Sequence, residues 1–117
     1  MEKIQIQGKD YITVNERVKE FRKLHPQGQI ITQIMANADG QVMFQAKIMV
    51  EGVLVATGHA YEKEGSSFIN KTSYIENCET SAIGRALGMY GIGIDTSLAS
   101  ADEVANAVTQ QKEDFKL

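Results

Sequence analysis

Basic and aromatic side chains alternate in the segment 61–85, and they are the residues of this sequence best suited to a binding chemistry. Aromatic rings stack on nucleobases of any sequence, while Lys and Arg neutralise the phosphates. This mixture favours a surface for single-stranded nucleic acid. The expected DNA-binding set has three aromatic and four basic members, one of them upstream of the segment: Tyr61, Phe68, Tyr74, Lys47, Lys63, Lys71 and Arg85. The competing interpretation is that Tyr61 and Tyr74 fill the core and that the lysines are merely solvated.

Catalytic chemistry has few candidates. A nucleophile would have to be Cys78 with His59 or His25, but Cys78 lies inside an apolar helical pattern that predicts a buried thiol. Glu76 and Glu79, three apart on a helix, have no acidic cluster around them, and one cysteine with two histidines is too few for structural zinc. The glycines do not form a phosphate-binding motif after a strand. We therefore expect no enzyme activity, no metal and no cofactor.

Three helices and three strands are predicted to position these residues. The first helix is capped by Thr13 or Asn15 and ends at His25-Pro26. The second begins at Ser73 and stops at Gly91-Ile92-Gly93. The first helix is expected to have a charged, solvent-exposed face formed by Arg17, Lys19, Glu20, Arg22 and Lys23. In the second helix, Gly84 and Gly88 indicate close packing against the sheet, and Arg85 between them would bind, unless it pairs with Glu79 or Asp95.

Residues 29–61 alternate in polarity and predict three antiparallel strands. Asp39-Gly40 and Glu51-Gly52 suit two-residue turns, which would set Val50 opposite Val53. Counting back from these turns assigns two sheet faces. One would carry Ile31, Gln33, Met35, Val42, Phe44, Ala46, Ile48, Val55, Thr57, His59 and Tyr61. The other would carry Ile30, Thr32, Ile34, Ala36, Met43, Gln45, Lys47, Met49, Leu54, Ala56, Gly58 and Ala60, and its small residues would admit a helix. The fold class is therefore α+β with a curved antiparallel sheet of at least three strands.

Length, composition and charge limit the domain organisation, the cellular location and the oligomeric state. A chain of 117 residues with 43% hydrophobic content fits one domain, expected over residues 1–108, including a third helix that begins after Ser100, with 109–117 as a mobile tail. The sequence has neither a bilayer-length apolar run nor a secretory leader, so we expect a cytoplasmic protein without membrane contact. Residues 1–26 carry six basic against four acidic side chains, and residues 76–117 three against seven. With a net charge of −3, several subunits would have to combine small basic faces, which favours a homo-oligomer and salt-sensitive binding.

The sequence resembles a family of small early phage proteins over most of residues 14–108. The resemblance rests on Ser73-Tyr-Ile-Glu-Asn-Cys-Glu-Thr-Ser-Ala-Ile-Gly-Arg-Ala-Leu-Gly-Met-Tyr-Gly-Ile-Gly-Ile-Asp, with Ala56-Thr-Gly-His-Ala-Tyr-Glu upstream. It is similar to the single-stranded DNA-binding proteins of lactococcal phages. The resemblance implies binding of single-stranded DNA without sequence preference, in a variant of the oligonucleotide-binding (OB) fold. It further implies a role in phage replication and recombination, in the host cytoplasm, with an annealing protein or a recombinase as partner.

Three alternatives remain open. The second helix is also similar, more loosely, to phage single-strand annealing proteins of the Erf type, and an uncovered sheet face would equally suit a phage protein-interaction module. The order helix, three strands, helix also permits a double-stranded-RNA-binding arrangement. Such a domain places a lysine cluster at the start of its second helix, and this sequence has only Lys71 there.

Overall fold

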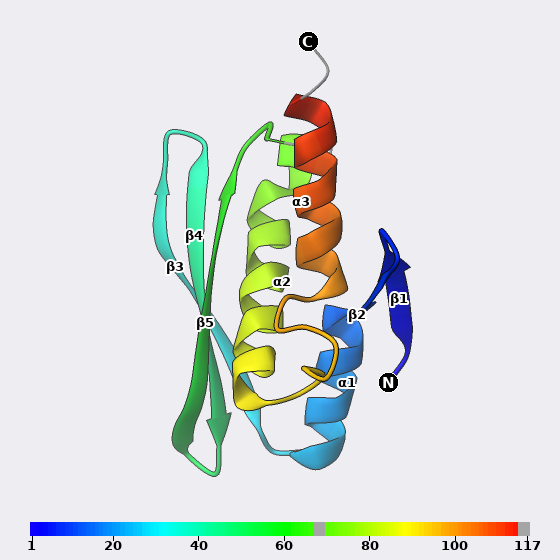
Figure 1. Ribbon diagram of the computed structural model, residues 1–117. Coiled ribbons are helices and arrows are strands. Elements are labelled where there is room, and N and C mark those ends of the chain that lie inside the picture. Colours follow the sequence, from blue (N-terminus) through cyan, green and yellow to red (C-terminus); the bar gives the residue numbers. More distant parts are fainter. Residues whose placement is uncertain (67–69, 115–117) are drawn as a thin grey trace.

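A computed structural model describes residues 1–66 and 70–114, in which a three-stranded sheet forms one layer and helices form the other (Figure 1). The elements follow the order β1 (Lys3–Ile6), β2 (Lys9–Ile12), α1 (Val14–Leu24), β3 (Gln29–Ala38), β4 (Gln41–Val50), β5 (Val53–Lys63), α2 (Asn70–Tyr90) and α3 (Ala101–Asp114). In the part described, no helix is both long and apolar enough to span a membrane.

The main sheet has the strand order β3-β4-β5, with antiparallel neighbours throughout. Its two turns fall at Asp39-Gly40 and Glu51-Gly52, as predicted, with positive φ at all four residues. The α+β class is confirmed. The strands form an open meander rather than the five-stranded barrel of an OB fold, so the expected OB variant is not confirmed.

A second sheet, the β1–β2 hairpin, was missed by the sequence analysis. Its turn residues Gln7 and Gly8 have φ values of 51° and 81°, the positive values that a tight two-residue hairpin requires. The strands are only four residues long and mostly exposed, with Ile12 as their one buried residue, so they lack the apolar alternation that reveals a half-buried strand.

Helix α2 packs on one face of the main sheet at very close range. A Cβ atom added at Gly58 of β5 would lie 2.3 Å from the backbone nitrogen of Ala86, so only glycine allows this approach. The expectation that the small residues of β5 would admit a helix is confirmed. The buried core beneath α2 includes Val42, Phe44, Ala46 and Ile48 of β4, together with Ala82, Ala86 and Leu87 of α2.

The sequence analysis assigned residues of neighbouring strands to the wrong common face of the sheet. Each hairpin contains a register shift, between Ile34 and Ala36 in β3 and between Ile48 and Met49 where β4 meets β5. One additional residue in a strand inverts every side chain beyond it. Phe44 therefore shares the helix-covered face with Ile34 and Ala60, its cross-strand partners, instead of with Ile31 and Tyr61.

Helix α1 has the predicted limits, since the Thr13 side chain accepts a hydrogen bond from the Glu16 backbone and His25 forms the C-cap. Its charged face differs from the prediction at one position. Arg17 is fully buried, and its guanidinium donates to the carbonyl oxygens of Gly84 (2.8 Å), Leu98 (2.9 Å), Ser97 (3.0 Å) and Gly93 (3.1 Å). It thus ties α1 to α2 and to the segment 91–100.

Two helix ends lie beyond their predicted positions. Helix α2 begins at Asn70 and is kinked at Ser73, the predicted start, where φ and ψ are −135° and 25°. Helix α3 begins after Ser100, whose Oγ accepts from the Glu103 backbone nitrogen (3.2 Å), and continues to Asp114. Residues 109–114, assigned to the tail by the sequence analysis, are therefore helical.

Candidate nucleic-acid interface

The face of the main sheet opposite α2, here called the open face, is uncovered by any described element. Its exposed apolar side chains include Ile31, Met43, Leu54 and Tyr61, which are 44%, 39%, 49% and 53% accessible. Single exposed apolar residues are ordinary, but several on one uncovered sheet face indicate an interaction surface, here divided by a polar row of Gln33, Gln45 and His59 between Ile31 and Met43. The sequence predicts that one face admits a helix, and the structure leaves the opposite face without a covering element among the described residues.

Three residues of the expected DNA-binding set belong to the open face. Lys47 lies in the middle of β4, between Ile31 of β3 and Thr57 of β5. Tyr61 and Lys63 lie near the end of β5, opposite Met43 and Gln41. The face thus combines an exposed ring with two cationic groups on a rigid sheet.

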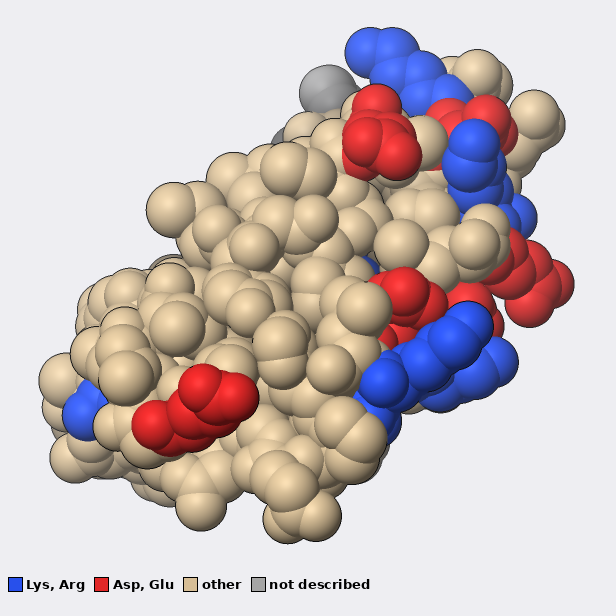
Figure 2. Space-filling view, turned by 90° about the horizontal axis from the view of Figure 1, so that it is seen from below, with Lys and Arg blue, Asp and Glu red and all other residues tan. Residues whose placement is uncertain are grey.

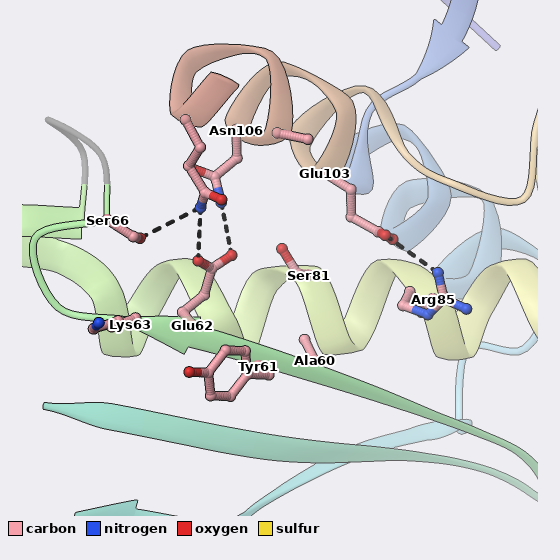
Figure 3. A pocket seen from close by; sticks show the side chains of 11 residues that line it. Ala60, Tyr61, Glu62, Lys63, Ser66, Ser81, Arg85, Glu103 and Asn106 are labelled. Carbon is pink, nitrogen blue, oxygen red and sulfur yellow. Dashed lines mark hydrogen bonds and ion pairs between the residues drawn. The ribbon is translucent and has the colours of Figure 1, made fainter. Parts of the chain in front are cut away.

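A cleft of about 380 Å³ opens at the edge of β5, between that strand, α2 and α3, and Figure 3 shows its lining residues. Tyr61 and Lys63 contribute to its rim, while Glu62 points from β5 toward α3. The Glu62 carboxylate accepts from Asn106 Nδ2 (2.6 Å), Asn70 Nδ2 (2.7 Å) and Gln110 Nε2 (3.2 Å). Burial raises the pKa of Glu62, although these three hydrogen bonds act in the opposite direction.

This amide-carboxylate cluster was not found from the sequence. Its members come from β5, α2 and α3, and only the inward position of Glu62 in the strand alternation could have indicated it. The cluster joins α3 to the sheet layer. The donors to Glu62 are uncharged side-chain amides, so the cluster holds a buried carboxyl group without a cationic partner.

Arg85 also lines this cleft, but its guanidinium forms an ion pair with an acidic residue. Its Nη1 lies 3.3 Å from Glu103 Oε2 of α3, and the side chains are 39% and 17% exposed (Figure 3). From the sequence, Glu79 or Asp95 was a possible partner of Arg85, and the structure shows Glu103 instead. The flanking glycines do pack closely, but against α1 and the segment 91–100: Gly84 faces Val14, and Gly88 faces Arg17 and Leu98.

The remaining members of the expected set are at the start of α2. Lys71 is exposed in its first turn. Tyr74 is partly buried and packs against the core, in the manner of the competing interpretation. Phe68 lies outside the described residues.

The candidate nucleophile is in a poor position for catalysis. Cys78 is buried beneath α2, where its sulfur lies 3.2 Å from the Ala60 carbonyl oxygen, and burial raises its pKa to about 11. His59 lies in the exposed open face, and His25 Nε2 is 2.9 Å from the Tyr90 hydroxyl. A thiol with this pKa is protonated at neutral pH and is a weak nucleophile.

Charged side chains are sparse on the sheet side of the end of the molecule that Figure 2 shows. Figure 2 shows a broad surface almost without Lys, Arg, Asp or Glu on the left, where the sheet lies in Figure 1, and mixed charges on the side of α1 and the hairpin. Among the described residues, neither Lys47 nor Lys63 forms an ion pair with a carboxylate.

A family model described as "Slr1353 N-terminal dsRNA-binding domain-like" matches residues 18–90, more than half of the chain. The chain belongs to this family. The matched residues span most of α1, the whole main sheet and α2, which together have the order helix, three strands, helix. Comparisons with curated proteins and with solved structures found no match. The description of the Slr1353 family points to nucleic-acid binding in general.

Proposed function

We propose that the protein binds single-stranded DNA without sequence preference, through the open face of β3, β4 and β5. The observation that carries the proposal is the exposed Tyr61 ring, set in an apolar sheet surface between Lys47 and Lys63. Base stacking on an aromatic ring contributes about 1–3 kcal/mol per base, and any base provides the required π-face. The protein acts by binding and not by catalysis.

The open face favours a single strand over a duplex. A flat apolar sheet reaches bases only when they are turned out of a helix, as in single strands, whereas a duplex presents mainly phosphates and sugars. Two lysines on this surface are few for tracking a duplex backbone, but they suffice to hold phosphates beside stacked bases. A role in phage replication and recombination, beside an annealing protein or a recombinase, rests only on the resemblance carried by segments 56–62 and 73–95.

Double-stranded RNA is the second candidate ligand, because the family description names it. The start of α2 argues against it. Its first turn offers Lys71 as its only basic side chain, beside Asn70, Thr72 and Ser73. A duplex-binding domain of this order needs several cations there to span the phosphates.

Fluorescence anisotropy with labelled oligonucleotides distinguishes these ligands. The probes are single-stranded DNA, the matching DNA duplex and an RNA duplex of equal length, each at 50 and 200 mM salt. We expect the single strand to bind at least about tenfold more tightly than either duplex, and its affinity to fall as salt rises. Preference for the RNA duplex would replace the proposal by the second candidate, and absence of binding to all three would overturn nucleic-acid binding altogether.

A further inference from the structure

Strand β3 forms an outer edge of the main sheet and has an unusual composition for an edge. Its ten residues, Gln29–Ala38, include no charged residue and no proline. It pairs with β4 on one side only, and no described strand lies on its other side. Soluble proteins usually protect such edges with lysine, proline or a covering element, because unpaired backbone groups bind further strands.

The side chains of β3 are exposed on both faces of the sheet. Ile31 belongs to the open face and is 44% accessible. Ile34 belongs to the helix-covered face, opposite the buried Phe44, yet it is 49% accessible, and Met35 at the register shift is 50% accessible. Helix α2 lies over β5 and β4 and reaches β3 at few points, such as the hydrogen bond from Thr32 to Glu79 (2.7 Å), which leaves Ile34 and Met35 exposed (Figure 1).

We propose that β3 pairs with β3 of a second copy of this chain, antiparallel about a two-fold axis, to form a continuous six-stranded sheet. A register that sets Ile34 opposite Ile34 of the second copy keeps both open faces on the same side of the sheet, and it would bring the exposed apolar side chains of β3 into cross-strand contact. An isologous contact of this kind requires a strand that is compatible with itself.

The charges favour β3 over the other edge of the sheet. An uncharged strand placed beside its own copy brings no like charges together. The β5 edge carries Glu62 and Lys63, and its end borders the cleft beneath α3, so α3 obstructs the approach of a second chain there. The proposed dimer would also join two open faces, and so two copies of Lys47, into one surface.

Sedimentation velocity of the full chain, without nucleic acid, tests the pairing. The wild type should form a species of about twice 12.9 kDa at micromolar concentration. Ile34→Lys should weaken self-association at least about tenfold, because two ammonium groups would meet near the axis. Leu54→Lys is the matched control, since Leu54 has the same 49% accessibility but lies on β5. It should remain a dimer.

A charge rescue separates repulsion from misfolding. Ile34→Glu alone should also be monomeric, whereas an equimolar mixture of Ile34→Lys and Ile34→Glu should recover the dimer. A wild type that stays monomeric at all accessible concentrations would overturn the proposal. So would a dimer that survives Ile34→Lys, one that Leu54→Lys weakens equally, or a mixture that stays monomeric. Because no DNA is present, these outcomes are independent of the proposed DNA binding.

Discussion

Arg17 shows how one residue can hold several segments together. Its guanidinium is completely buried and donates to four carbonyl oxygens, from α2 and from the segment 91–100. Burial lowers the pKa of Arg17, but arginine still remains charged inside proteins. The four acceptors satisfy Nη1 and Nη2, whereas Nε is buried without a hydrogen-bond partner among the described residues.

Replacing Arg17 by methionine should destabilise the protein strongly. Methionine has a similar length, but it would leave these buried carbonyl oxygens without their donor, at a cost of about 3 kcal/mol or more in the free energy of unfolding. Urea denaturation, monitored by circular dichroism, measures this change in the free energy of unfolding. Lys19→Met is the control, since Lys19 is exposed and pairs only with Glu16 in its own helix, so it should change stability by less than about 0.5 kcal/mol. Equal effects of the two substitutions would contradict the structural role of Arg17.

Glu62 should make stability depend on pH. Its pKa is raised from an ordinary 4.5 by burial, so the folded chain holds the proton more tightly than the unfolded chain does. Its contribution to the free energy of unfolding must then fall as pH rises from 4.5 through the raised folded value. The free energy of unfolding of the wild type minus that of Glu62→Gln, measured in urea from pH 4 to pH 7, should decrease as pH increases. A difference that grows with pH would show that the folded pKa is lowered.

At the scale of elements, α3 is attached mainly by polar contacts. Among its described residues Ala101 is buried in the core, and its polar contacts include Asp102 with the Val14 backbone nitrogen (2.8 Å), Glu103 with Arg85, and the amides of Asn106 and Gln110 with Glu62. An acidic helix thus lies over the one arginine of the cleft.

Neutralising Glu103 should increase affinity for single-stranded DNA. Glu103→Gln would release Arg85 for phosphate and remove a negative charge beside the β5 edge, and we expect about a threefold gain at low salt. Glu76→Gln removes the same charge from an exposed position on α2 and should have a smaller effect. Anisotropy titrations compare both variants with the wild type. An unchanged affinity in Glu103→Gln would exclude Arg85 from the interface.

The sequence predicted those elements whose local chemistry is strong. Thr13 as a cap, the two glycine turns and the close approach at Gly58 all follow from properties of single residues. The face assignment failed because a register shift is a property of two paired strands, and one extra residue at Met35 leaves no mark on local polarity. The burial of Arg17 and the Arg85–Glu103 pair were missed for a similar reason, since each depends on segments distant in sequence.

For the whole molecule, an uneven distribution of charge matters more than the net value of −3. Acidic side chains are concentrated toward α3, on the helix side of the sheet, while the open face carries Lys47 and Lys63 in an apolar surface. Proteins with a net negative charge bind nucleic acid only through such a local face. The proposed dimer would double that face without adding acidic groups to it, because β3 has none.

The most direct test of the account is the affinity of Tyr61→Ala for a labelled single-stranded DNA oligonucleotide. Met89→Ala is the matched control, because Met89 is similarly exposed, at 60% against 53% for Tyr61, but lies on α2. Loss of one stacking contact of about 1–3 kcal/mol predicts a decrease of roughly 5- to 150-fold for Tyr61→Ala and little change for Met89→Ala. Wild-type affinity in Tyr61→Ala, or an equal loss in both variants, would contradict binding through the open face.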